Sequence, residues 1–323
     1  MHEVRASPFL KAVGGKAGVL PALAPYLPAP GQITGYREPF IGGGALFFLR
    51  YAEVRPALVA DLNWRLIDAY IAVRDHVEEL LIALDEEQPL YSEAHFYAVR
   101  DQLNSESQRA RFLSLVERAV GVFVISKWGF NGLWRENPRG GINTSFGKPS
   151  KPGGPPPRLC DRDSLRACSA ALAGVDVRAG YFDEQLDDLR PRELVLFDPP
   201  YVPVSDTADF TAYTADGFTY GDAAQVDLFG AATLSDGARL ALAMQRVDNA
   251  GAYFAMTNSA AAEPFFPGWA HVTYQAGRSV NSKGGKRGPV DELLFRNFEV
   301  DAHGTVVRRG RSAGSVGASL VTP

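Results

Sequence analysis

Hydrophobic and polar positions along the chain predict an alternation of buried strands with helices. Residues 57–61 ("ALVAD") predict a buried strand, and 252–258 ("AYFAMTN") predict another strand. The continuous apolar run in 193–197 ("ELVLF") is typical of a strand in a parallel sheet, which is covered on both faces. Residues 64–84 ("WRLIDAYIAVRDHVEELLIAL") place apolar side chains at three- and four-residue steps, which predicts one long amphipathic helix. Strands that alternate with helices predict an α/β domain with a doubly wound, Rossmann-like sheet.

The remaining segments complete this outline. Residues 36–49 predict a short strand, a glycine turn and the start of a helix; 176–182 and 291–298 predict further strands; 92–128 and part of 223–251 predict helices. From 129 to 157, Gly, Asn and Pro interrupt the pattern, which indicates a long loop region or a small subdomain. The tail from about residue 304 contains "RRGRSAGSVGAS" and is expected to be disordered.

Composition narrows the class of protein. The chain has 323 residues, 46% of them hydrophobic, so it can bury a large core. There is no run of eighteen apolar residues, and the N-terminus lacks the apolar segment of a signal peptide, so we expect a cytoplasmic protein. Cys160 and Cys168 have no His or Cys companions nearby in sequence and are expected to be reduced thiols rather than metal ligands.

The net charge of −4 does not by itself suggest a nucleic-acid binder, but the positive charges are clustered. Residues 127–151 contain five Lys or Arg and one acid, and residues 278–287 contain four Lys or Arg and no acid. These two basic islands are either solvated loops or contacts for a polyanion.

A glycine turn and an acid predict a cofactor pocket. In "EPFIGGG" the glycines at 42–44 let the backbone approach a ligand, and the helix that follows offers its N-terminal amides. The pattern is not GxGxxG, because Phe47 occupies the sixth position. Asp61 ends the next strand about twenty residues later, where an acid can bind ribose hydroxyls; the alternative is that Asp61 or Asn63 caps the following helix. The "GGK" at 14–16 is not a phosphate-binding loop, because Ala17 stands where Ser or Thr is required.

The segment "LVLFDPPY" (194–201) predicts the reactive centre. A base amine such as adenine N6 is a poor nucleophile, because its lone pair is delocalised into the ring. Asp198 and the carbonyl of Pro199 can accept its two hydrogens, and Pro200 stiffens the turn that aims these acceptors. Tyr201 offers a ring on which an unstacked base can lie. The alternative is an ordinary strand-ending turn with a capping acid.

Taken in order, these motifs resemble one family over roughly residues 7–298. The resemblance is carried by "PFLKAVGGK", "YREPFIGGGALFF", "LVADLNWRLIDAY", "WGFNGLWRENPRGGINTSFGK", "VLFDPPY", "ADFTAYTADGF" and "GRSVNSKGGKRGPVDELL". The chain is similar to the Dam-type DNA adenine-N6 methyltransferases (D12 class, alpha group).

The resemblance implies S-adenosylmethionine as the methyl donor. The positions that match the family's donor-binding motifs are Ala12, Lys16, Glu38, Pro39, Phe40, Gly42, Gly44, Asp61, Phe182 and Asp198, with Tyr181 as an alternative to Phe182. Ala12 departs from the family, which usually has Trp in "FLKWAGGK". Either another aromatic residue fills that place or the affinity for the donor is reduced.

The resemblance also implies duplex DNA as the substrate. The hairpin-like stretch in 129–148 supplies most candidate DNA contacts, which are Lys11, Phe130, Asn131, Leu133, Arg135, Asn143, Ser145 and Lys148. Asn131-Gly132 is a tight-turn dipeptide, Phe130, Leu133 and Trp134 can wedge or stack at a base step, and Arg135 can reach a guanine edge. Residues 278–287 match a basic loop that grips the DNA backbone. Relatives commonly read GATC, but Ser145 replaces a usual proline and Lys148 a usual arginine.

The sequence thus predicts a methyltransferase domain at 1–74 and 158–303, a mainly helical target-recognition insert at 75–157, and a tail at 304–323. The expected reaction is methyl transfer to N6 of a flipped adenine, with no metal, by a monomer, with a cognate restriction endonuclease as one conceivable partner. Two alternatives are a methyltransferase that acts on RNA or on a protein amide, and a DNA-binding relative that has lost donor binding.

Overall fold

A seven-stranded sheet forms the centre of the molecule. The structure is a computed structural model that describes residues 4–11, 15–109, 113–132, 134–137, 139–148, 154–204, 217–220, 225–226, 232–277 and 289–311. The strands of the sheet are β1 (Gly35–Glu38), β2 (Ala57–Asp61), β3 (Asp176–Ala179), β4 (Glu193–Phe197), β7 (Tyr253–Ser259), β8 (Ala270–Gly277) and β9 (Pro289–Arg296). Their order is β3-β2-β1-β4-β7-β9-β8. Strands β3, β2, β1, β4 and β7 run parallel, while β9 is antiparallel to both β7 and β8.

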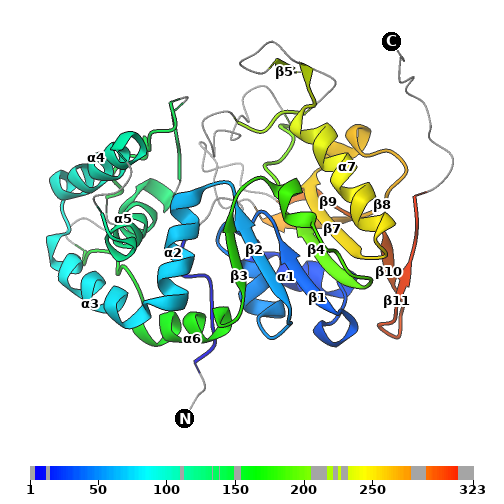
Figure 1. Ribbon diagram of the computed structural model, residues 1–323, viewed down its shortest axis with the longest axis horizontal. Helices are drawn as coiled ribbons and strands as arrows, with labels where there is room; N and C mark the ends of the chain where they lie inside the picture. Colours follow the sequence, from blue (N-terminus) through cyan, green and yellow to red (C-terminus); the bar gives the residue numbers. More distant parts are fainter. Residues whose placement is uncertain are drawn as a thin grey trace.

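Helices cover both faces of this sheet (Figure 1). They are α1 (Leu20–Leu23), α2 (Trp64–Asp75), α3 (Val77–Glu87), α4 (Glu93–Arg109), α5 (Leu115–Trp128), α6 (Arg162–Leu172) and α7 (Asp236–Asn249). Helices α3, α4 and α5 gather at one end of the molecule, next to α2. Two small antiparallel pairs, β5 (Gln225–Val226) with β6 (Ala232–Thr233) and β10 (Phe298–Val300) with β11 (Val306–Arg308), lie outside the main sheet.

Strand β4 shows why its sequence is apolar at four consecutive positions. Its side chains alternate between the two faces of the sheet. Leu194 and Leu196 join the core that contains α2, whereas Val195 and Phe197 join the core that contains α7. Because both faces of the strand are covered by helices, the side chains on each face are apolar. This explains the continuous apolar run in the sequence.

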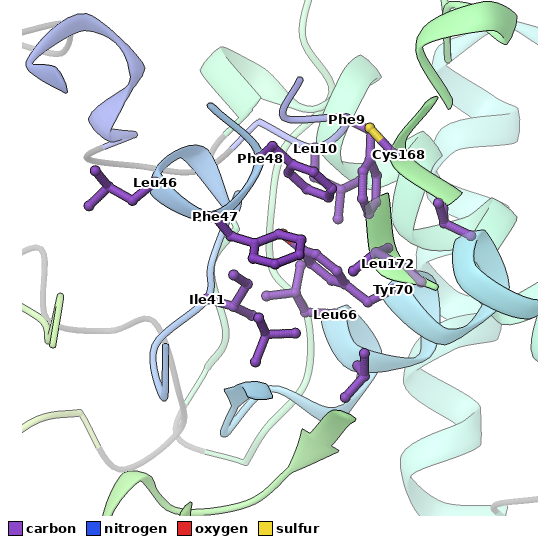
Figure 2. Packing of buried hydrophobic residues seen from close by; sticks show 14 of the residues in the cluster. Phe9, Leu10, Ile41, Leu46, Phe47, Phe48, Leu66, Tyr70, Cys168 and Leu172 are labelled. Carbon is purple, nitrogen blue, oxygen red and sulfur yellow. The ribbon is translucent and has the colours of Figure 1, made fainter. Parts of the chain in front are cut away.

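The N-terminal segment packs into the larger core through aromatic rings. The Phe9 ring centroid lies 4.9 Å from that of Tyr70 and 5.6 Å from that of Phe123. Figure 2 shows Phe9 and Leu10 with Phe48 and Tyr70 in this cluster. Burying such rings contributes roughly 1.5–3 kcal/mol each. This packing places Lys11 close to Gly42 of the glycine turn and to Leu66 of α2.

The structure confirms the predicted strands at 57–61, 193–197 and 252–258 and the α/β fold class. The prediction of one helix over 64–84 is wrong: α2 ends at Asp75 and α3 begins at Val77. The break is at His76, whose backbone (φ −135°, ψ 34°) is not helical. This break changes the direction of the chain, so that α3 turns away from the sheet and packs against α5. A continuous helix would keep the direction of α2.

Three further elements differ from the sequence expectations. Helix α6 and strand β8 were not predicted; β8 is an edge strand with weak apolar alternation. The expected disorder from about residue 304 does not hold for Val306–Arg308, which pair with β10, and residues 312–323 lie outside the described part. Among the described residues, no helix is both long and apolar enough to cross a membrane.

Candidate active site

The predicted site residues meet at the carboxyl edge of the parallel strands. Glu38 ends β1, Asp61 ends β2, and Asp198 directly follows β4. From β1 the strands β2 and β3 extend the sheet to one side, whereas β4 and β7 extend it to the other, so the strand order reverses between the parallel neighbours β1 and β4. Ligands of open α/β sheets bind in the crevice at such a point. The sheet topology therefore brings together segments that are 160 residues apart in sequence.

Asp198 is held by two donors at one of its oxygens. Its Oδ1 lies 2.7 Å from Lys16 Nζ and accepts a hydrogen bond from Thr257 Oγ1 at 2.6 Å. The side chain is 22% exposed, so it faces an accessible space and not packed apolar groups. Burial by itself lowers the pKa of Lys16, but the charge of Asp198 and its hydrogen bond outweigh burial and raise it. Lys16 is therefore a permanent cation that fixes the orientation of the carboxylate.

Tyr201 is fixed at both its ring and its hydroxyl. Lys16 Nζ lies 4.8 Å from the centroid of the Tyr201 ring. The Tyr201 hydroxyl donates to Glu292 Oε2 at 2.9 Å, and Tyr274 donates to the same oxygen at 2.6 Å. Burial, followed by the charges of Asp198 and Glu292, raises the pKa of Tyr201 well above its ordinary value. The phenol thus stays neutral and serves as an oriented aromatic surface.

The turn after Tyr201 is tied to β7 and to a second tyrosine. The Val202 amide donates to Asn258 Oδ1 at 3.0 Å, and Ser259 Oγ donates to the Val202 carbonyl at 2.7 Å. The Tyr220 hydroxyl donates to the carbonyl of Pro200 and accepts from Asn258 Nδ2 at 2.9 Å. The stiffness predicted from the two prolines is thus reinforced by contacts from residues about 20 and 60 positions away.

Glu38 is a buried carboxyl group at the centre of the site. The Tyr36 hydroxyl donates to Glu38 Oε2 at 2.7 Å, and the Phe47 amide donates to the same carboxyl group. Burial raises the pKa of Glu38 to about 8, and the charge of Asp198 adds to this, while Lys16 opposes it. A carboxyl group in this setting is ready to ionise when a cation arrives next to it.

The glycine turn needs residues without a side chain. Gly44 has φ 69°, and a Cβ at this position would lie 2.6 Å from the Tyr70 hydroxyl oxygen. The Gly42 amide donates to Asp61 Oδ2 at 3.1 Å, and the Asn63 amide donates to Asp61 Oδ1 at 2.9 Å. Burial raises the pKa of Asp61 to about 6, although these amides oppose the shift. Asp61 thus keeps accepting capacity at both oxygens, while Asn63 is the residue that caps α2.

Aromatic rings line the neighbouring part of the edge. Phe40 and Phe182 stack with their ring centroids 5.1 Å apart, and Phe218 lies 6.1 Å from each. Phe182 is buried, whereas Tyr181 is exposed and lies under the Arg239 guanidinium at 4.7 Å. Of the two residues that the sequence left open, Phe182 is the one in contact with the glycine-turn segment. Pro39, between Glu38 and Phe40, is buried.

Residues 129–132, 134–137 and 139–147 form a hairpin-like unit, called the recognition hairpin below after the role that the sequence predicts for it. Antiparallel bridges join Gly129 to Phe146 and Glu136 to Ile142. Asn131 and Gly132 have φ of 56° and 65°, which confirms the tight turn predicted from this dipeptide. A Cβ on Gly132 would lie 2.6 Å from the Lys11 side chain, so Lys11 packs against the turn.

The predicted DNA-facing side chains of this region share one property, which is exposure to solvent. They are Lys11, Phe130, Asn131, Arg135, Asn143, Ser145 and Lys148. Trp134 is different. It is only 8% exposed, and its Nε1 donates to Glu136 Oε1 at 3.1 Å, so the expectation that it wedges between bases is wrong.

Some predictions fall outside the described residues. They concern Ala12, Leu133, most of the "ADFTAYTADGF" motif and the basic island at 278–287. Other residues of the site were missed at the sequence level: Thr257, Tyr36, Glu292 and Tyr274. Each of them touches Asp198, Glu38 or Tyr201. The polar ending of an otherwise apolar strand, "AMTNS", was the one signal that pointed to Thr257.

Comparison with known proteins decides the family. Residues 13–235 match the D12 class N6 adenine-specific DNA methyltransferases. The chain belongs to this family. A Type II methyltransferase of Lactococcus lactis subsp. cremoris, M1.LlaDCHI, is 30% identical over 303 residues, which cover 92% of this chain and 97% of the relative. The Type II methyltransferase M.MjaIII of Methanocaldococcus jannaschii is 30% identical over 310 residues, 90% and 99% of the two chains. The DNA adenine methylase of Escherichia coli (strain K12) is 30% identical over 297 residues, 88% and 93%.

Membership in the D12 methyltransferases confirms the predicted resemblance and the predicted class of enzyme, a DNA adenine methyltransferase. It agrees with the mixed α/β sheet. It also implies a methyl donor and a DNA substrate. Within the described residues there is no group of His, Cys, Asp or Glu side chains that could hold a metal ion.

Proposed function

We propose that this D12 methyltransferase transfers a methyl group from S-adenosylmethionine to N6 of an adenine flipped out of duplex DNA. The observation that carries the proposal is the geometry of Asp198, which is held at one oxygen by Lys16 and Thr257 and is accessible. Asp198 and the Pro199 carbonyl accept the two amine hydrogens and draw the nitrogen toward tetrahedral geometry. Tyr201, fixed through Glu292, supplies the face on which the base stacks.

The chemistry of the donor set fits S-adenosylmethionine, which supplies an electrophilic methyl group on a sulfonium cation. Glu38 and Asp198 are acids that compensate its positive charges, and Lys16 is the cation of the same cluster. Asp61 has accepting capacity for a ribose diol, and next to it the Asn63 Nδ2 is buried without a hydrogen-bond partner among the described residues. Gly42, Gly44, Pro39, Phe40 and Phe182 form the remaining walls in this proposal.

The proton on the methylated nitrogen needs no dedicated base. Once it is methylated, the amine is cationic and strongly acidic, so it loses a proton readily. Asp198 therefore acts as an acceptor that orients the amine, which agrees with its two permanent donors, Lys16 and Thr257.

The recognition hairpin and helices α3, α4 and α5 form the target-recognition insert, 75–157, in this proposal. Its exposed side chains offer chemistry suited to DNA, with Arg135 for a base edge, Lys148 and Lys11 for phosphates, and Phe130 for a base step. GATC is the recognition sequence to test first, since DNA adenine methylases are among the relatives. Type II methyltransferases are among them too, which makes a cognate restriction endonuclease a partner to search for.

The test combines one variant with one matched control. Asp198→Ala should lower methyl transfer to duplex DNA at least about a thousandfold and leave duplex affinity within about threefold, because an orienting acceptor acts at the reacting atoms. Asp163→Ala removes a carboxylate that is 73% exposed on α6 and should change neither quantity. Transfer to RNA or protein in place of duplex DNA would refute the proposal, as would calorimetry that detects no S-adenosylmethionine binding at millimolar concentration.

A further inference from the structure

A buried ion pair joins α2, a helix that packs on the central sheet, to the recognition hairpin. Arg65 Nη1, in the first turn of α2, lies 3.3 Å from Glu136 Oε1, and the two side chains are only 4% and 8% exposed. The same oxygen accepts from Trp134 Nε1 at 3.1 Å. Arg65 Nη2 also reaches the carbonyl of Gly140, which lies in the turn between Glu136 and Ile142, at 3.5 Å. One arginine thus holds both the end of one hairpin strand and the turn that follows it.

The alternation of side chains along the hairpin makes this contact relevant to DNA reading. Trp134 and Glu136 turn toward the protein, so Arg135 between them turns to solvent. The Arg135 backbone is fixed on the other strand, because its amide donates to Thr144 Oγ1 at 3.2 Å and its carbonyl accepts from the Asn143 amide at 3.0 Å. Any shift of Trp134 and Glu136 therefore moves Arg135 with them.

A second anchor comes from the helical insert. Asn104 of α4 accepts from the Ile142 amide at 2.6 Å and donates to the Ile142 carbonyl at 2.9 Å, and Arg100 donates to the Thr144 carbonyl at 3.2 Å. These contacts fix the hairpin backbone to α4. The Arg65 contact fixes it to α2, whose N-cap, Asn63, is hydrogen-bonded to Asp61.

A charged pair at this position is not explained by stability alone. Two charges removed from water lose hydration, and well-packed apolar residues often stabilise a protein equally well. The best-attested use of such pairs is to select one arrangement among several of similar energy. The chain thus has a directional contact where a hydrophobic one would permit the hairpin to slide or tilt.

We propose that Arg65 is a positioning residue for sequence recognition, acting through Glu136 and Trp134 to set the place of Arg135 relative to the catalytic centre. The inference rests on the proposed function, because it assigns the hairpin to DNA reading. It adds a residue of the catalytic part of the chain, outside the recognition insert, to the determinants of specificity.

The experiment measures discrimination between DNA sites. The recognition site is first read by sequencing N6-methyladenine in DNA from cells that express the wild-type protein. Binding and methyl transfer are then compared for a duplex with that site and for duplexes with one base pair changed. Arg65→Glu and Glu136→Arg should each lower the discrimination ratio at least about tenfold, and the double variant should recover at least half of the loss on a logarithmic scale. The affinity for S-adenosylmethionine without DNA should stay within about threefold.

Two comparisons separate positioning from loss of fold. Arg74→Gln changes another arginine of α2, whose pair with Asp75 is near the surface, and should leave discrimination unchanged. Glu136→Gln keeps an acceptor for Trp134 without the charge and should lower discrimination severalfold even if Arg65→Glu does not fold. Single variants with wild-type discrimination, or a double variant no better than the singles, would overturn the inference. A wild-type protein that neither methylates nor discriminates would refute the proposed function itself.

Discussion

Glu38 offers the sharpest quantitative prediction, because it is a buried carboxyl group with two hydrogen-bond donors. The carboxyl group is 3% exposed, accepts from the Tyr36 hydroxyl and the Phe47 amide, and shares the site with Asp198 and Lys16. Burial raises its pKa from 4.5 to about 8. Glu38→Gln keeps the shape and an oxygen acceptor but removes the titration.

The direction of the effect follows from proton linkage. Between pH 4.5 and about 8 the folded protein holds a proton on Glu38 that the unfolded chain has released. The free energy of unfolding therefore falls as pH rises through this window. Above the window, Glu38 causes no further decrease. One pKa unit corresponds to about 1.4 kcal/mol, so the shift corresponds to a loss on the order of 5 kcal/mol across the window. In Glu38→Gln this loss is absent.

Urea unfolding at pH 5, 6, 7, 8 and 9 tests the prediction. The stability of Glu38→Gln relative to the wild type should rise with pH by roughly 3–5 kcal/mol between pH 5 and 9. Glu86→Gln makes the same carboxyl-to-amide change at an exposed position of α3 and serves as the control. Parallel stability curves for the wild type and Glu38→Gln would refute the reasoning, because Glu38 would then titrate alike in the folded and unfolded states.

Three further substitutions test separate parts of the site. Gly44→Ala should destabilise by about 1–3 kcal/mol in urea unfolding, since its φ is 69° and the new Cβ would meet the Tyr70 hydroxyl; Gly18→Ala, with open space around the added Cβ, should change stability far less. Asp61→Asn should raise the calorimetric Kd for S-adenosylmethionine about tenfold or more and leave duplex affinity unchanged; an unaltered Kd removes Asp61 from the donor pocket. Arg135→Ala should relax the choice at one base pair by about 1–3 kcal/mol in methylation of mismatched duplexes, and an unchanged preference would exclude it from base reading.

Local sequence chemistry determined most of the frame. Four apolar residues before Asp198 identify a strand that is covered on both faces, and Pro199 and Pro200 mark its end. Gly44 could be predicted as a turn residue because only a residue without Cβ adopts φ 69° there at low cost. Asn131-Gly132 predicted a tight turn at the start of the hairpin for the same reason. Such features depend on a few neighbouring residues, so the pattern alone carries them.

The tertiary structure decided which groups meet. Thr257 and Glu292 reach Asp198 and Tyr201 from strands that are 59 and 91 residues further along the chain, and Arg65 meets Glu136 across 71 residues. Trp134 donates to the same Glu136 carboxylate, so its ring makes an internal contact and does not wedge between bases. Contacts of this kind arise from strand order and helix packing, which bring distant side chains together without leaving a periodic trace in the sequence. The sequence alone determined the central buried strands, the glycine turns and the carboxylate at 198, whereas the fold determined how that carboxylate and the recognition hairpin are held.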